Sequence, residues 1–206
     1  TSLVVIDTDT RLDILIQKAE EQLENRDQYT SASVKNLEDA LAAAKETAGN
    51  GQASEEERNA AYNTLAEAMA SLVRKAEKSE LANALEKANE ILAESDRYVE
   101  ETITGLQAAV DEAQAVYDNE EADSSEVGEA VKVLVAEVLK ARLLGDVDGN
   151  GAVETQDAAE VLKYAAETKE LTEVQVKAAD VNRDAVSDSS DVAVILQYAA
   201  EMREGF

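Results

Sequence analysis

The stretch GDVDGNGAVETQD, residues 145–157, places oxygen-bearing side chains at alternate positions and closes on an aspartate. Counted from Asp146, side-chain oxygens stand at positions one, three and five, a glycine at six and a carboxylate at twelve. A calcium loop of the EF-hand type requires this spacing, because the ion takes about six to eight oxygen ligands and the backbone turns sharply at position six. The sequence therefore predicts a calcium site that includes the backbone carbonyl of the seventh residue. The predicted ligands are Asp146, Asp148, Asn150, Ala152 and Asp157.

A second stretch of this kind, DVNRDAVSDSSD, begins at Asp180, thirty-four residues after the first. Ala185 stands where the glycine is needed, and a positive φ strains a residue that carries a Cβ atom. Ser187 replaces the apolar residue expected at position eight, so we expect weaker calcium binding in this loop. Two such loops, each opening a helix, predict two calcium ions; the alternative is a pair of acidic turns that bind no ion. The predicted ligands of the second loop are Asp180, Asn182, Asp184, Val186 and Asp191.

The charge of the whole chain agrees with a cation as ligand, since the chain has 45 acidic and 19 basic residues and a net charge of −26. Such a surface repels phosphate, so nucleic acid is not an expected partner. No apolar run approaches the roughly 20 residues that span a bilayer, so membrane insertion is not expected either. In the two loops an ion would hold together carboxylates that otherwise repel, and its binding energy would become folding energy.

Two missing residue types narrow the function further. The chain has no Cys and no His, which excludes disulfides, thiolate metal sites and the Ser–His–Asp and Cys–His catalytic sets. We therefore do not expect an enzyme. The absence of Pro, together with many Ala, Glu, Lys and Leu residues, predicts an all-α fold.

The first two thirds of the chain contain an internal repeat. A shift of 69 residues, without a gap, places Leu12 on Leu81, Tyr29 on Tyr98 and Leu65 on Leu134. Helical spacing of apolar residues predicts three helices in each copy, so we expect bundles over residues 10–76 and 77–143, after a tail or linker over residues 1–9. The expected helix boundaries are a break at Asp27–Thr30, a stop at Gly49–Gly51, and helix starts capped by Ser54 and Asp123.

The junction of the two bundles lacks helix breakers. From Glu55 to Glu94 there is no Gly and no Pro, which predicts one continuous helix shared by both bundles and hence a stiff spacer. A kink near Ser79 is the alternative. The tyrosines of the bundles are interpreted as core residues rather than binding residues: Tyr29, Tyr62, Tyr98 and Tyr117.

Residues 10–143 resemble the FIVAR family of small three-helix modules. The resemblance rests on LEDALAAA, on the stretch Tyr29–Ser33, and on the S-x-x-E…A…L pattern of the third helix. A Trp common in that family is Val34 in the first copy and Ile103 in the second. The alternative is a generic helical spacer.

Residues 144–206 resemble a dockerin domain. The match is carried by LGDVDGNGAVETQD, ADVNRDAVSDSSD, the paired YAAE endings and the aspartate that closes each loop. The first loop also lacks its own incoming helix, because Gly145 follows a spacer helix expected to end near Leu143, and Thr172 is expected to open a short helix through about Ala179. The expected architecture is thus two tandem three-helix bundles followed by a calcium-loop helical dockerin domain.

The resemblance implies that the chain binds a cohesin domain of a scaffoldin or partner enzyme through its first and third dockerin helices. It further implies a monomer when free, in a secreted, extracellular or cell-surface complex of a bacterium, within carbohydrate-degrading assemblies such as cellulosomes. The alternative is a calcium-stabilised adhesin stalk or calcium sensor without a cohesin partner. The positions that match the family's contacts are Thr155, Gln156, Leu162, Lys163 and Glu167, with the mirror set Ser189, Ser190, Leu196, Gln197 and Glu201.

Some dockerins bind in two orientations related by a half-turn, and the two sets are nearly symmetric. Here Lys163 corresponds to Gln197 and Gln156 to Ser190, so we expect one preferred orientation. The alternative is that Leu162 and Leu196 are core residues rather than binding residues. Val161 and Ile195 could, however, fill the core in their place.

Overall fold

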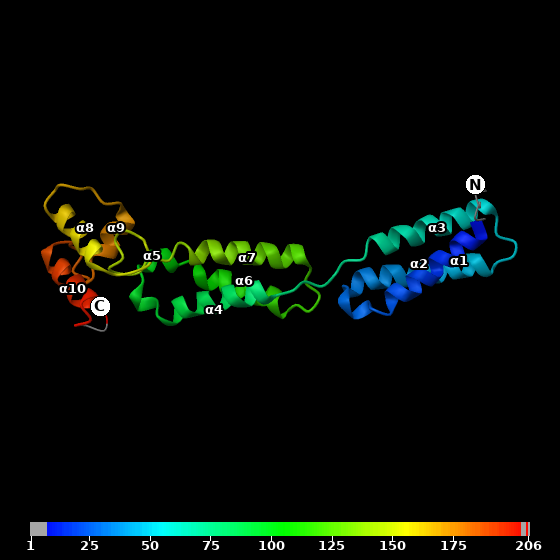
Figure 1. The fold of residues 1–206 in the computed structure, drawn as a ribbon, viewed down its shortest axis with the longest axis horizontal. Coiled ribbons are helices and arrows are strands. Elements are labelled where there is room, and N and C mark those ends of the chain that lie inside the picture. The colour runs from blue at the N-terminus through cyan, green and yellow to red at the C-terminus, as the bar shows by residue number, and fades with distance from the viewer. Residues whose placement is uncertain (1–7, 203–204, 206) are drawn as a thin grey trace, which may run out of the picture. The chain divides into compact units, whose positions relative to one another are not determined.

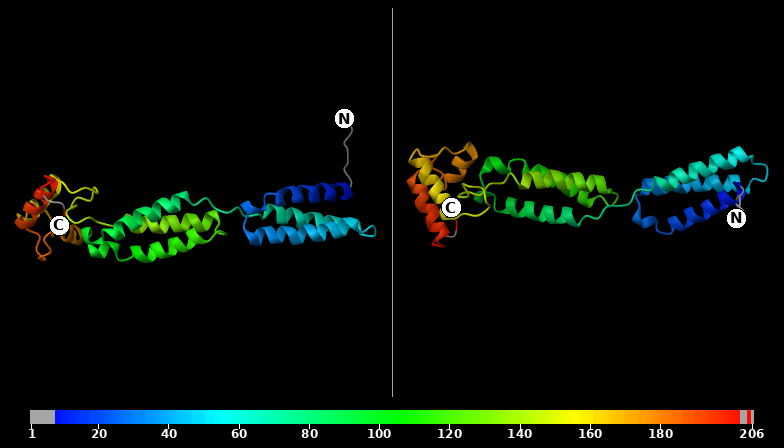
Figure 2. Two further views of the ribbon diagram at one scale, coloured as in Figure 1. Left: turned by 90° about the horizontal axis from the view of Figure 1, so that it is seen from below. Right: turned by 45° about the horizontal axis from the view of Figure 1, so that its top comes forward.

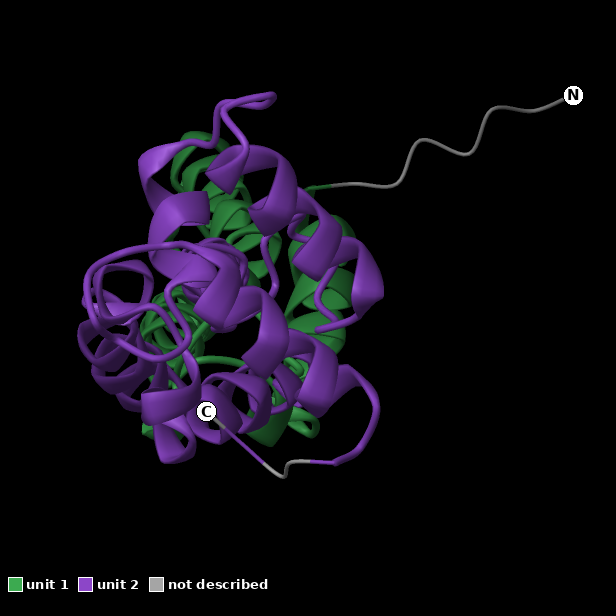
Figure 3. Cartoon of the chain, turned by 90° about the vertical axis from the view of Figure 1, so that its left-hand side faces the viewer, with its two compact units in different colours: residues 1–77, 118–127 green, residues 78–117, 128–206 purple. Residues whose placement is uncertain are grey.

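The computed structural model describes residues 8–202 and 205, and over these residues the chain is all-α, as predicted (Figure 1). Helices are joined by turns, and the only β pairing in the described part consists of isolated bridges. The chain divides into two compact units (Figure 3). One contains residues 1–77 and 118–127, the other residues 78–117 and 128–206. Of the tail or linker expected over residues 1–9, residues 1–7 lie outside the described residues, whereas Thr8 and Asp9 belong to the first helix, which corrects that boundary.

The first bundle consists of α1 (Thr8–Leu23), α2 (Ser31–Gly49) and α3 (Glu55–Ala70), with a short 3-10 turn η1 (Arg26–Gln28) between the first two. Both views of Figure 2 show these three helices side by side. Their apolar faces meet in one core, and the fully buried leucines at its centre are Leu12, Leu37 and Leu65.

The predicted helix boundaries of the repeat are confirmed where side chains cap the backbone. Ser54 accepts a hydrogen bond from the Glu57 amide at 3.2 Å, and the Glu57 carboxylate accepts one from the Ser54 amide at 2.7 Å. The same reciprocal pair forms between Asp123 and Glu126, at 3.0 and 2.9 Å. Each pair satisfies amides that the first helical turn leaves unpaired.

The second copy departs from the first within its middle helix. Thr104 and Gly105 interrupt it, because glycine is a poor helix former and the Thr104 hydroxyl donates to the Glu101 carbonyl, three residues back. The elements of this copy are α4 (Ser79–Ala93), η2 (Ser95–Arg97), α5 (Glu100–Ile103), α6 (Leu106–Asp118) and α7 (Ser124–Val138). Its fully buried leucines, Leu81, Leu106 and Leu134, include the repeat partners of Leu12 and Leu65.

The prediction of one continuous helix between the bundles is wrong. α3 ends at Ala70 and α4 begins at Ser79, which agrees better with the predicted kink than with a rod. Residues 71–78, the first exit segment, instead pair with the turn before α2. The Thr30 amide donates to the Val73 carbonyl and the Lys75 amide to the Gln28 carbonyl, both at 2.9 Å.

The predicted end of the last bundle helix near Leu143 is also wrong, for the same reason. α7 ends at Val138, and residues 139–144 form a second exit segment. The Val99 amide donates to the Arg142 carbonyl, and the Leu144 amide to the Arg97 carbonyl, both at 2.8 Å. Hydrogen bonds to a remote turn therefore replace the last helical turns in both copies.

Tyr29 and Tyr62 pack against the first core, and Tyr98 is half-buried, in agreement with their interpretation as core residues. Tyr117 is 39% exposed, so this interpretation is wrong for it. The Lys78 ammonium lies 5.9 Å from the centre of its ring, close enough for a cation–π contact.

Glu121 is expected to titrate far below an ordinary glutamate. Its carboxylate pairs with the Lys75 ammonium at 2.9 Å and accepts from the Ser31 amide, which together lower its pKa to about 2. Because the folded-state pKa is depressed, this contribution to stability is present above the ordinary value of 4.5 and is lost as pH falls through about 2. Carbon-13 NMR of the Glu121 carboxyl group should give a midpoint near 2; a midpoint near 4.5 would contradict the contact.

The last sixty residues form a small helical domain. It contains α8 (Thr155–Ala165), α9 (Glu173–Ala179) and α10 (Ser189–Ala199), and α8 packs against α10. The short middle helix begins after Thr172, whose side chain caps it, and ends at Ala179, as predicted. The core of this helical domain contains residues that are fully or almost fully buried: Val147, Val161, Ala178, Val181 and Ile195.

Candidate metal centre

The first acidic loop is ordered around the carboxylate of Asp146, which is almost fully buried. Its Oδ1 accepts from the amides of Gly149 at 2.8 Å and Asn150 at 3.1 Å, and its Oδ2 accepts from the Gly151 amide at 3.1 Å. Gly149 and Gly151 have φ values of 82° and 88°, a region that glycine enters without strain. The backbone therefore turns inside the loop as the sequence predicts.

The closing residue of this loop, Asp157, is fully buried. One carboxylate oxygen accepts from the amides of Val147 at 2.8 Å and Asp148 at 3.0 Å, and the other accepts from the Glu154 amide at 2.9 Å. Burial raises the pKa of Asp157, while these three amides act in the opposite direction and the charge of Asp148 raises it further. A cation beside this carboxylate would favour its ionised form.

The structure brings three of the predicted ligands together. Carboxylate oxygens of Asp146, Asp148 and Asp157 lie within 4.8 Å of one another, and this is the one such acidic group among the described residues. Asn150 lies beside them, since its side-chain nitrogen donates to Asp148 at 3.2 Å and its oxygen accepts from the Ala152 amide at 2.8 Å. The donors are all oxygens, which fits a hard cation such as calcium.

The second loop repeats the hydrogen bonds of the first. The carboxylate of Asp180 accepts from the amides of Asp184 at 3.0 Å and Ala185 at 2.9 Å. The fully buried Asp191 accepts from the amides of Asn182 at 3.2 Å and Asp188 at 3.0 Å. Asn182 stands where the first loop has Asp148, and the remaining carboxylates of Asp180, Asp184 and Asp191 do not form such a close group.

Two residues of the second loop adopt the backbone conformation that glycines adopt in the first. Arg183 has φ 61° and Ala185 has φ 67°, and these residues correspond to Gly149 and Gly151. The strain at Ala185 is as the sequence predicts, whereas the strain at Arg183 was missed. Each side-chain-bearing residue in this region costs about 1–2 kcal/mol. Ser187 is buried at position eight and donates to the Val176 carbonyl at 2.8 Å, which satisfies its hydroxyl.

Ala185→Gly is expected to strengthen calcium binding at the second loop. Removing strain of about 1 kcal/mol should raise its affinity about fivefold, measured by calorimetric titration. The reciprocal change, Gly151→Ala, is the matched control for the first loop, because a Cβ there would meet no atom within 4 Å and φ alone sets the cost. An unchanged affinity in Ala185→Gly would contradict the expectation that strain at this position weakens calcium binding.

The predicted partner-binding residues all lie on the surface, on or at the ends of α8 and α10. Leu162 is 54% exposed and Leu196 is 42% exposed, while Val161 and Ile195 are fully buried. The alternative that both leucines belong to the core is therefore wrong. Lys163 pairs with Glu160 at 2.8 Å.

The symmetry of the two halves extends to the ends of these helices. Glu167 and Glu201 have φ values of 55° and 56°, and their amides donate to the carbonyls of Tyr164 and Tyr198, both at 2.9 Å. A left-handed residue at this point closes a helix by satisfying its last carbonyls. The helices that carry the two predicted sets thus end with the same backbone geometry.

The fold and this centre define a class of protein: three-helix bundles joined to a helical domain with two acidic loops, the first of which could hold a metal ion. The chain belongs to the FIVAR family, whose domain matches residues 10–73 and again residues 77–137, and it carries a dockerin type I domain over residues 144–198. No curated protein and no solved structure compared with the chain matches it.

These matches give the coarse function. Dockerin type I domains bind calcium and dock onto cohesin domains, and FIVAR is a non-catalytic module. Dockerin domains belong to extracellular cellulosome components. Within the described residues, no helix combines the length and the apolar character needed to cross a bilayer.

Proposed function

We propose that the chain docks onto a cohesin-bearing scaffold, in a calcium-dependent manner, through the surface of α8 and α10. One observation carries the proposal: two equivalent leucines, Leu162 and Leu196, are exposed on helices that begin at the two acidic loops. An apolar side chain ringed by polar groups is typical of the energetic centre of a protein interface. A stalk or sensor would give no reason for this matched exposure.

Calcium would supply the positive charge that holds each loop closed. In the first loop Asp146, Asp148, Asn150 and Asp157 would hold it with the Ala152 carbonyl, and Asp157 also caps the start of α8 through the Glu154 amide. In the second loop the ligands would be Asp180, Asn182, Asp184, Asp191 and the Val186 carbonyl. The same carboxylates that order the loops therefore fix the starts of the two helices that carry the leucines.

The bundles would act as a helical spacer that precedes the dockerin domain. We propose domain boundaries at residues 10–76, 77–143 and 144–206. The prediction of a stiff spacer was based on one continuous helix between the bundles. Because an exit segment joins the bundles instead, that argument for stiffness no longer holds. The strong negative charge of the chain opposes self-association, so we expect the free chain to be monomeric in light scattering.

The proposal is tested by calorimetric titration of the whole chain with a panel of cohesin domains. Binding is expected with at least one cohesin in excess calcium, and its loss is expected on addition of EDTA, because the loops lose the ion that orders α8 and α10. Restored calcium should restore binding. Calcium binding without any cohesin binding across the panel would favour the alternative, a calcium-stabilised stalk or sensor.

A further inference from the structure

We propose that the second FIVAR bundle is a working part of the dockerin domain, and that its η2–α5 corner holds the strained second calcium loop in shape. The inference rests on the proposed calcium sites. It concerns Asp96, Val99 and Glu101 of the bundle, which lie outside both sets of predicted site residues.

The first step is that the corner enters the hydrophobic core of the dockerin domain. Val99 is only 3% exposed and belongs to the same buried cluster as Val147, Val181 and Ile195. The backbone continues the contact, since the Leu144 amide, at the start of the dockerin domain, donates to the Arg97 carbonyl of the corner at 2.8 Å. Apolar burial of this kind is a feature of one domain rather than of two modules that merely follow each other.

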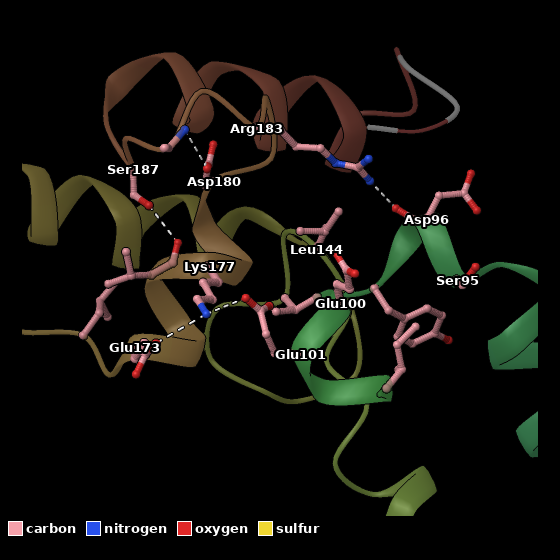
Figure 4. Close-up of a pocket in the computed structure, with 16 residues that line it drawn as sticks. Ser95, Asp96, Glu100, Glu101, Leu144, Glu173, Lys177, Asp180, Arg183 and Ser187 are labelled. Carbon is pink, nitrogen blue, oxygen red and sulfur yellow. Dashed lines mark hydrogen bonds and ion pairs between the residues drawn. The ribbon is translucent and has the colours of Figure 1, made fainter. Parts of the chain in front are cut away.

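The second step is that the polar contacts of the corner reach the second loop and the helices beside it (Figure 4). The Arg183 guanidinium donates to the Asp96 carbonyl, and the Lys177 ammonium pairs with the Glu101 carboxylate at 2.6 Å. Arg97 donates to the Tyr198 hydroxyl at 3.2 Å. The first two of these contacts border an open groove of about 950 Å³, which Leu144 also lines.

The third step is the difference between the two loops. The first loop has glycines where the backbone is left-handed, and its extra contact comes from the adjoining exit segment, in which Arg142 donates to the Asp146 carbonyl at 3.3 Å. The second loop has Arg183 and Ala185 at the equivalent positions, and Arg183 is the residue that the bundle holds. A strained conformation persists only where its surroundings enforce it. The bundle corner supplies that enforcement.

The experiment uses the whole chain with Arg183→Gln and Glu101→Gln combined. These changes remove the side-chain anchors and touch no predicted calcium ligand. Calorimetric titration with calcium is expected to show the second site weakened about tenfold and the first site unchanged within about twofold. The matched control is Arg26→Gln with Glu38→Gln, an exposed pair at 3.1 Å in the first bundle, which should change neither site.

Arg183→Gly separates strain from anchoring. Glycine loses the anchor but adopts this φ freely, so its second site should bind more tightly than that of Arg183→Gln. Hydrogen exchange gives an independent readout: the Val99 and Leu144 amides, paired across the corner and the exit segment, should exchange more slowly in calcium than in EDTA.

The outcomes distinguish this inference from the proposed function. If neither loop of the parent chain binds calcium, the proposed function fails together with the inference. If both loops bind but the double variant matches the parent, or loses both sites equally, only the inference fails. Unchanged exchange of Val99 between calcium and EDTA would also contradict it.

Discussion

Asp157→Ala should remove calcium binding at the first loop and destabilise the dockerin domain by about 3 kcal/mol or more, even in excess calcium. The substitution deletes a predicted ligand and leaves three amide donors without their acceptor. Each unsatisfied buried donor costs about 1–3 kcal/mol. Thermal and urea unfolding followed by circular dichroism would measure the loss, and calorimetry would count the calcium ions bound.

Two further variants control this result. Asp39→Ala removes an exposed aspartate, paired with Lys35 at 3.1 Å, and should change stability by no more than about 0.5 kcal/mol. Asp157→Asn keeps an acceptor oxygen but not the charge, so it should lose calcium while unfolding less readily than Asp157→Ala. The metal centre is wrongly assigned if Asp157→Ala still binds two ions with the affinity of the parent chain.

The combined substitution Leu162→Ala and Leu196→Ala should abolish detectable cohesin binding while leaving calcium binding and helicity unchanged. Both side chains are about half exposed and neither belongs to the buried cluster of the domain, so their loss removes little core packing. An anchor at the centre of an interface is worth about 2–4 kcal/mol, or roughly 30- to 1,000-fold in affinity. Calorimetric titration with a cohesin that binds the parent chain would measure the loss.

The single substitutions test the orientation of binding. Because Lys163 and Gln156 have different counterparts in the second half, we expect one single variant to lose most of the affinity and the other to lose little. Equal small losses from both single variants, with collapse only in the double variant, would instead demonstrate two interchangeable orientations.

Features set by short-range spacing could be predicted from the sequence. The turns of the first loop follow from glycines at fixed positions, and the helix starts at Ser54 and Asp123 follow from side chains three residues apart. The metal group follows as well, because its three carboxylates fall within twelve residues. Ligation and cohesin contact remain predictions.

Features that depend on remote backbone could not be predicted in the same way. The segment from Glu55 to Glu94 contains no Gly or Pro, so its local sequence favours a helix. The Val73 carbonyl nevertheless accepts a hydrogen bond from the Thr30 amide, more than forty residues away in the sequence. Two signals were available and were missed. Arg183 aligns with Gly149, which marks a left-handed position, and Val99 is apolar where its repeat partner Thr30 is polar.

The two exit segments form equivalent hydrogen bonds at positions related by the 69-residue repeat. The Val73 amide donates to the Ser33 hydroxyl at 3.2 Å, and the Arg142 amide donates to the Thr102 hydroxyl at 3.0 Å. Three residues further on, the Ala76 amide donates to the Ala122 carbonyl at 2.9 Å, as the Gly145 amide does to the Ala178 carbonyl at 2.7 Å.

The carbonyl that accepts this last hydrogen bond belongs to a bundle loop at Ala122 and to a dockerin helix at Ala178. Whole copies of the 69-residue repeat could therefore be gained or lost by a gene while the hydrogen bonds at the junctions stay the same. Protein engineers could lengthen the chain in the same increments.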